Sequence, residues 1–191
     1  MTPPDHLLII VDPQNDFVDG SLAVPGAAKA LGDLARFIAE GKARDYAHVI
    51  ITLDSHPATH CSFKANGGIW PQHCVAGSQG AAIWLPLKEA LEKSGTPYTA
   101  LTKGTNQARE EYSIFGNELS RKHIIDLAKK YDANGADICG VAGDYCVKET
   151  FIDAAAVFGT DHVEVLTRFT ASTDGGSTLN DILNTSSLCA R

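Results

Sequence analysis

The chain has 191 residues, of which 44% are hydrophobic and 20% are charged, and its formal net charge at pH 7 is −7. This length and balance are typical of a soluble globular protein, and we expect residues 1–191 to form a single domain. The negative charge argues against nucleic acid and anionic membrane surfaces as partners. The apolar run at residues 7–11 has no basic segment before it, and no stretch approaches the ~18 apolar residues of a membrane span. We therefore expect neither a signal peptide nor a transmembrane helix.

The cysteines indicate a reducing compartment. The chain has five of them, an odd number without the dense spacing of a disulfide framework. Free thiols in the cytoplasm fit this pattern better than disulfides do. The five are Cys61, Cys74, Cys139, Cys146 and Cys189.

The first predicted strand ends at an acidic residue. Residues 7–11 form a continuous apolar run, as expected of a strand buried on both faces in a parallel sheet, and Asp12 follows it. Chemistry in open α/β sheets gathers at the carboxyl ends of the strands, so Asp12 is well placed for catalysis. Alternatively, Asp12 only opens a turn before Pro13. Residues 27–40 then show the apolar period of a helix.

The second predicted strand runs into a segment rich in histidine. Residues 48–53 are the strand, and Asp54 and His56 lie two positions apart, so their side chains point the same way along an extended chain. With His73 they could form a two-His, one-carboxylate metal site with open positions for water or substrate. The same loop could instead be a polar cap without a metal. His60 could be a further ligand, a residue that supports a ligand or a surface residue, and we favour the last two.

The middle of the chain continues the alternation of helices and strands. We predict helices at residues 81–93 and 119–131, with a short strand at residues 98–101 between them. Lys103 follows that strand. Most lysines are solvated surface charges, but a lysine beside a carboxylate and a thiol would favour the thiolate.

A strand, a tight glycine-containing turn and a helix surround Cys146. Residues 136–141 are predicted to be a buried strand, and apolar residues recur at helical spacing from Cys146 onward. The first turn of a helix would stabilise a thiolate and lower the pKa of the thiol, and its free N–H groups could hold an oxyanion. A small cysteine packed in a helix core is an equally good interpretation of Cys146 alone.

The last elements complete an α/β pattern. Residues 162–166 are predicted to be a strand and residues 178–188 a helix, with residues 167–172 between them in a loop. Strands alternating with helices predict a three-layer doubly wound α/β fold with a mainly parallel central sheet. Right-handed crossovers then bring the ends of the strands, with Asp12, Asp54, Lys103 and Cys146, to one edge.

Taken together, five segments resemble those of the nicotinamidases and pyrazinamidases, a family of isochorismatase-like cysteine hydrolases. The similarity runs from about residue 7 to about residue 175, with the order and spacing of the segments intact. At Gly143 many members carry Thr or another polar residue, and residues 167–172 replace a loop that usually starts with an acidic residue. The segments are Val11-Asp12-Pro13-Gln14-Asn15-Asp16-Phe17, Asp54-Ser55-His56-Pro57, Trp70-Pro71-Gln72-His73-Cys74, Lys103-Gly104 and Gly140-Val141-Ala142-Gly143-Asp144-Tyr145-Cys146-Val147.

The resemblance implies roles for particular residues. It implies a catalytic triad of Cys146, Asp12 and Lys103, and an oxyanion hole made by the backbone N–H groups of Ala142 and Cys146, with a cis peptide bond before Ala142. It also implies one divalent metal ion bound by Asp54, His56 and His73, with zinc expected first and iron or manganese as alternatives. The implied substrate-binding residues are Phe17, Trp70, Tyr112, Ala142 and Tyr145.

The implied activity is hydrolysis of nicotinamide to nicotinate and ammonia through a thioester, with pyrazinamide as a further substrate and a role in NAD salvage. One alternative is a related amidase acting on ureido or carbamoyl substrates. Another is a binding module without catalysis, which is disfavoured because all triad and metal positions are filled. The expected partner is a small amide, and a homo-oligomer is compatible with the sequence.

Overall fold

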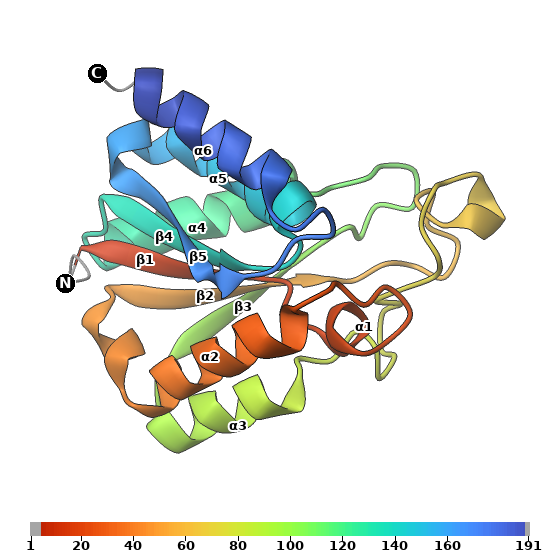
Figure 1. Cartoon of the computed structure of the whole chain (residues 1–191), viewed down its shortest axis with the longest axis horizontal. Helices are drawn as coiled ribbons and strands as arrows, with labels where there is room; N and C mark the ends of the chain where they lie inside the picture. Colours follow the sequence, from red (N-terminus) through yellow and green to blue (C-terminus); the bar gives the residue numbers. More distant parts are fainter. Residues whose placement is uncertain (1–4, 190–191) are drawn as a thin grey trace.

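A computed structural model describes residues 5–189, with side chains through residue 185. Five parallel strands form one sheet in the order β3-β2-β1-β4-β5 (Figure 1). This arrangement confirms the predicted doubly wound α/β fold. The strands are β1 (His6–Val11), β2 (His48–Asp54), β3 (Tyr98–Lys103), β4 (Gly135–Gly140) and β5 (Val163–Thr170).

Helices cover both faces of the sheet, in three layers (Figure 1). On one face, α2 (Ala27–Ala39) and α3 (Leu85–Ser94) pack over one set of apolar strand residues. On the other face lie α4 (Glu118–Lys130), α5 (Lys148–Phe158) and α6 (Ser177–Cys189). A short helix, α1 (Asn15–Val18), lies in the loop that follows β1.

The central strand β1 explains why the sequence shows an unbroken apolar run. Leu8 and Ile10 face the α2 side, whereas Leu7 and Ile9 face the α5 side, and all four side chains are fully buried. A strand that is covered on both faces needs apolar residues at every position rather than at alternate positions.

The chain reverses direction across the sheet between β1 and β4. The first three strands add outward from β1 to β3, and the chain then returns to place β4 on the other side of β1. Loops leaving two such neighbouring strands diverge to opposite faces, which opens a crevice at their carboxyl ends. Asp12 follows β1 and Cys146 follows β4, so both border this crevice.

Several element boundaries differ from the predictions. The helix predicted at residues 81–93 begins only at Leu85, because Ile83 pairs with Gln14 and the Trp84 N–H donates to the Pro13 carbonyl. Pro86, in the first turn, was a usable signal for the later start. Strand β5 extends to Thr170, four residues further than predicted, and so includes part of the predicted loop. Cys146 lies in a π-helical turn, Gly143–Val147, that precedes α5.

Within residues 5–189, no helix is both long and apolar enough to cross a membrane. Cys61, Cys74, Cys139 and Cys146 are free thiols. The side chain of Cys189 lies outside the described residues.

Candidate active site

Three side chains meet at the crevice, one at the end of β3 and two from the segments that follow β1 and β4. Lys103, the last residue of β3, reaches past the neighbouring strand β2, and its Nζ lies 2.8 Å from Asp12 Oδ2 and 3.5 Å from Cys146 Sγ. Both Asp12 and Lys103 are fully buried, and Cys146 is 6% exposed. A lysine is almost never buried without a charged partner, and this one has two, because its Nζ also lies 2.5 Å from Asp54 Oδ1. The structure thus brings the predicted triad together.

Asp12 is held in an orientation that its neighbours fix. Its backbone has φ of 47°, an unusual value for a residue other than glycine. The Thr52 hydroxyl donates to Asp12 Oδ1 at 2.6 Å, and the Asp12 N–H donates to the Thr52 carbonyl at 3.1 Å. Burial raises the pKa of the Asp12 carboxyl, and the nearby Asp54 carboxylate adds to this, despite the opposing charge of Lys103. A carboxylate with a raised pKa is a better proton acceptor, as a general base requires.

The pKa of Cys146 corrects one expectation from the sequence. We expected the helix N-terminus to lower it, but burial raises the pKa of the Cys146 thiol well above its usual value, and the positive charge of Lys103 does not compensate. Desolvation of the thiolate outweighs the attraction of the Lys103 charge. The group is therefore a thiol at rest, and a nucleophilic role would require a base; Asp12 lies within 4.8 Å of it.

The predicted oxyanion donor Ala142 lies beside Cys146. The Val141–Ala142 peptide bond is cis, as the resemblance implied. The Gly143 N–H donates to the Ala171 carbonyl at 2.8 Å, which anchors the turn to the end of β5. The Ala142 N–H donates to no oxygen of the described residues, and Ala142 lines the same cavity as Cys146. An oxyanion hole needs such an unpaired backbone donor.

Asp54, His56 and His73 form a cluster with the geometry of a metal site. One ligand atom from each lies within 4.8 Å of the other two. His56 Nδ1 is 2.9 Å from the Gly104 carbonyl and His73 Nδ1 is 2.8 Å from the Pro71 carbonyl, which fixes both rings and leaves each Nε2 free. Metal-binding histidines are usually oriented by such bonds. His56 Nε2 is buried without a hydrogen-bond partner in the described chain, 3.5 Å from Asp54 Oδ2.

The electrostatics of this cluster favour a cation. Burial lowers the pKa of His73, so its ring is a neutral ligand. Burial also opposes a charge on His56, yet the attraction of the Asp54 carboxylate, 3.5 Å away, outweighs burial and raises the pKa of His56. A positive charge at His56 Nε2 is therefore stabilised. One carboxylate and two imidazoles suit zinc, iron or manganese, so the residues present fit the implied divalent metal.

Gly104 is needed for the close approach of His56. It has φ of +67°, and a Cβ at this position would lie 2.6 Å from His56 Nδ1. Any other residue after Lys103 would displace the imidazole.

His60 supports the cluster rather than belonging to it. Its ring lies against that of His56 with 4.2 Å between centroids. Its Nε2 is 3.0 Å from the Arg109 carbonyl and its Nδ1 is 2.7 Å from the Ser62 hydroxyl, so both ring nitrogens are engaged.

A narrow cavity of about 40 Å³ adjoins the triad and the metal cluster. Trp70 Nε1 donates to the Tyr112 hydroxyl at 3.1 Å, and the Tyr145 ring meets Trp70 edge-on at a centroid distance of 5.0 Å. All five predicted substrate-binding residues line the cavity: Phe17, Trp70, Tyr112, Ala142 and Tyr145. Four further residues that the sequence did not predict also line the cavity: Leu22, Val24, Glu110 and Thr173. Of these four, only Glu110 could have been predicted to line the cavity, because it lies two residues before Tyr112 in the sequence.

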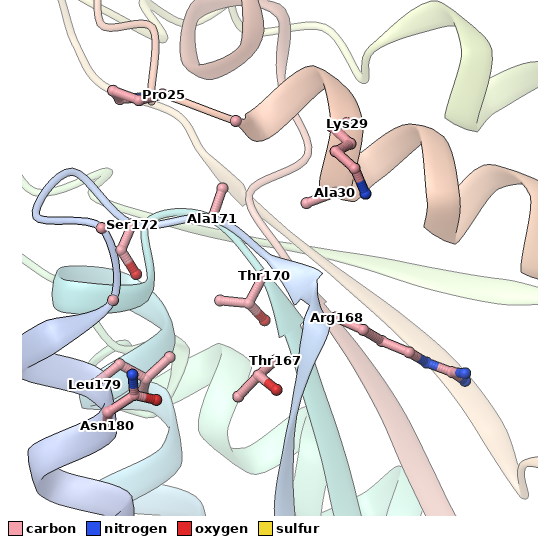
Figure 2. A pocket seen from close by; sticks show the side chains of 13 residues that line it. Pro25, Lys29, Ala30, Thr167, Arg168, Thr170, Ala171, Ser172, Leu179 and Asn180 are labelled. Atoms are coloured by element: carbon pink, nitrogen blue, oxygen red, sulfur yellow. The ribbon is translucent and has the colours of Figure 1, made fainter.

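A larger cavity of about 460 Å³ lies elsewhere, between α2, β5 and α6 (Figure 2). Its charged groups are already engaged. Lys29 pairs with Asp33 at 2.9 Å, and Arg168 points away from the cavity and packs over Phe37. The start of α6 is capped by Asp174. The smaller cavity, which contains Cys146, is therefore the better candidate for chemistry.

The fold and the cluster of Asp12, Lys103 and Cys146 together define a class of protein. A cysteine, an aspartate and a lysine at the carboxyl edge of a doubly wound parallel sheet are the arrangement of the isochorismatase-like cysteine hydrolases. Residues 6–157 match the family model described as the isochorismatase domain, so the chain belongs to this family.

Named relatives are similar to this chain over most of its length. The chain is 36% identical over 155 residues to a nicotinamidase/pyrazinamidase of Mycobacterium tuberculosis, covering 77% of each chain. The crystal structure of Pyrococcus horikoshii pyrazinamidase in complex with zinc matches with a TM-score of 0.78 and 30% identity, covering 97% of this chain and 96% of that one. A protein of L. infantum in complex with nicotinate matches with a TM-score of 0.81 and 30% identity, covering 98% and 92%.

Proposed function

We propose that this protein is a metal-dependent cysteine amidohydrolase that converts nicotinamide to nicotinate and ammonia. The observation that carries the proposal is the meeting of Cys146, Lys103 and Asp12 beside the cluster of Asp54, His56 and His73. Similarity to enzymes named nicotinamidase supports the substrate. The free Nε2 of His56 and the arrangement of the three donors support the metal.

Acylation begins with the transfer of a proton. Asp12 accepts the proton of the Cys146 thiol while Lys103, whose pKa the two carboxylates hold well above its usual value despite burial, stays charged beside the new thiolate. Sγ then attacks the amide carbon, and the carbonyl oxygen becomes an oxyanion. The N–H groups of Ala142 and Cys146 hold it, and each such donor contributes ~3–4 kcal/mol in comparable sites. Asp12 passes its proton to the amide nitrogen, the C–N bond breaks, ammonia leaves and a thioester remains.

Deacylation repeats the sequence with water. Asp12 accepts a proton from water as its oxygen attacks the thioester carbon, and the same N–H groups hold the second oxyanion. The C–S bond then breaks, and the proton returns from Asp12 to Cys146. A metal held by Asp54, His56 and His73 would supply a Lewis acid that orients the pyridine nitrogen and polarises oxygen ligands.

The cavity suits a flat heteroaromatic amide. Trp70, Tyr112 and Tyr145 present rings in edge-to-face and tilted contacts, and Phe17 lies against His73 at a centroid distance of 5.6 Å. Aromatic side chains bind a planar ring through such contacts. Pyrazinamide, which has the same shape, is a proposed second substrate.

The proposal extends to the setting of the enzyme. We assign it to NAD salvage because nicotinate and nicotinamide belong to that chemistry, and to the cytoplasm because the described thiols are free. We further propose that the whole chain acts as one hydrolase domain, with zinc as the first metal to test and iron or manganese as alternatives.

An ammonia-release assay with nicotinamide, pyrazinamide and a ureido substrate, each with and without a chelator, tests the proposal. We expect release from the two aromatic amides and its loss on chelation. Release from the ureido substrate alone would identify the carbamoyl amidase alternative. Binding of nicotinamide without ammonia release would indicate a non-catalytic module.

A further inference from the structure

Glu110 lies beside the proposed metal donors although it comes from a different loop. One of its carboxylate oxygens, one ring nitrogen of His56 and one ring nitrogen of His60 lie within 4.8 Å of one another. The side chain is half-buried and lines the active-site cavity. The Glu111 N–H donates to Glu110 Oε1 at 3.1 Å, and no described residue donates to the second oxygen. The carboxylate is thus fixed with one oxygen free.

Because His60 is already hydrogen-bonded, only Glu110 and His56 of these three residues can face a cation. Both ring nitrogens of His60 are hydrogen-bonded, one of them to the carbonyl of Arg109, the residue before Glu110. That bond ties the loop carrying Glu110 to the loop carrying His56, and a second bond, from the Cys61 N–H to the Gln107 carbonyl at 2.8 Å, does the same. His60 is therefore a positioning residue for Glu110.

The Glu110 carboxylate is needed to balance the net charge of the buried site when a divalent ion is bound. Asp12 and Asp54 carry two negative charges against one positive charge on Lys103, so a divalent ion would leave the site with one net positive charge. The Glu110 carboxylate brings the sum to zero. An uncompensated charge in a buried site is costly, so a nearby carboxylate stabilises the bound cation.

We propose that Glu110 is a second carboxylate of the metal site, which strengthens divalent cation binding and favours harder cations. The inference rests on the metal site of the proposed function. Carboxylate oxygens suit Mn²⁺ better than they suit the softer ions that imidazole prefers. Glu110 therefore contributes more to the affinity for Mn²⁺ than to that for Zn²⁺.

Competition between the metal-loaded protein and a colorimetric chelator tests this without any substrate. Glu110→Gln keeps the shape of the side chain and removes its charge, and we expect it to weaken Zn²⁺ binding about 10-fold to 100-fold, the usual effect of losing a supporting group. The loss for Mn²⁺ should be larger. The matched control is Glu118→Gln, the same change at an exposed position in the first turn of α4.

The outcomes separate this inference from the proposed function. An affinity of Glu110→Gln within twofold of that of Glu118→Gln, for both ions, would overturn the role of Glu110. His73→Ala serves as the reference, because it removes a proposed ligand outright. If His73→Ala also kept its metal, the metal site itself would be wrong. Thermal unfolding of the chelated variants checks that each one folds, and Glu110→Ala gives a second measurement should the glutamine bind metal through its own carbonyl.

Discussion

Cys146 is the residue on which the proposed chemistry depends. Its thiol is buried with a raised pKa, so in the proposed mechanism it becomes a nucleophile when Asp12 accepts the proton beside Lys103. A cysteine activated in this way differs from one that is a thiolate at rest, because it needs a base to remove its proton before it reacts.

Cys146→Ala should lower kcat for ammonia release by at least about 10³-fold, since no other group can form the thioester. The fold and the metal content should be unchanged, because alanine removes only one buried sulfur atom. Cys61→Ala, the same change at a half-buried thiol outside the triad, is the control. Ammonia release from Cys146→Ala at a rate near that of the control would remove Cys146 from the mechanism.

Lys103 has a structural role as well as a chemical one. It is fully buried between Asp12 and Asp54, whose carboxylates would otherwise face each other across the crevice. Removing one partner of a buried ion pair leaves the other charge unpaired and costs ~3–5 kcal/mol.

Lys103→Met should therefore lower the free energy of unfolding by ~3–5 kcal/mol, measured by urea titration in the presence of a chelator. Lys29→Met breaks an ion pair with Asp33 in which the lysine side chain is 83% exposed. Such surface pairs contribute about 1 kcal/mol or less. Similar losses of unfolding free energy in the two variants would show that the burial of Lys103 contributes nothing to stability.

At the scale of elements, the turn between β4 and α5 depends on a glycine that the resemblance marked as unusual. A Cβ on Gly143 would lie 2.1 Å from the Ser172 hydroxyl oxygen and 3.2 Å from side-chain atoms of Leu179 and Thr170. The loop after β5 and the start of α6 therefore pack directly on the bare Cα of this residue.

Gly143→Ala should cost ~1–3 kcal/mol of unfolding free energy, because the added methyl group overpacks this contact. Adding Ser172→Ala should recover much of the loss by removing the hydroxyl. Gly32→Ala is the control within α2, where a Cβ meets no atom within 4 Å, and the better helix propensity of alanine should stabilise the protein by ~0.5–1 kcal/mol. Urea titration measures all three. A stabilising Gly143→Ala would contradict the packing argument.

At the scale of the whole molecule, the sequence predicted which residues end the strands but not how the strands lie side by side. Apolar runs identified Asp12, Asp54, Lys103 and Cys146 because parallel strands end at one edge. That Lys103 must reach past β2 to meet Asp12 follows from the strand order, which depends on tertiary packing. The predicted lowering of the Cys146 pKa was wrong for a similar reason, since burial is a property of the folded molecule. Glu110 had no strand end to mark it, because its loop is positioned by hydrogen bonds from another loop.

The metal cluster joins segments that are distant along the chain, so its occupation should affect the stability of the whole molecule. Asp54 ends β2 and His56 follows it, whereas His73 comes from the loop that continues past Trp70. A ligand that binds only the folded state stabilises it by about 4 kcal/mol at 1,000 times its dissociation constant. For a chain of this size, we expect the melting temperature to rise by on the order of 10 °C.

Chelation should therefore lower the melting temperature and stop ammonia release together, and adding back Zn²⁺, Fe²⁺ or Mn²⁺ in turn should restore both. The ion that restores both at the lowest concentration is the one that the site prefers. His73→Ala is the control, because with one donor missing neither quantity should respond to the same concentrations of metal. If the melting temperature and the rate of the unmodified protein were the same before and after chelation, Asp54, His56 and His73 would instead be a polar cluster. In that case, the hydrogen bonds to the Gly104 and Pro71 carbonyls would orient the two histidines for packing alone.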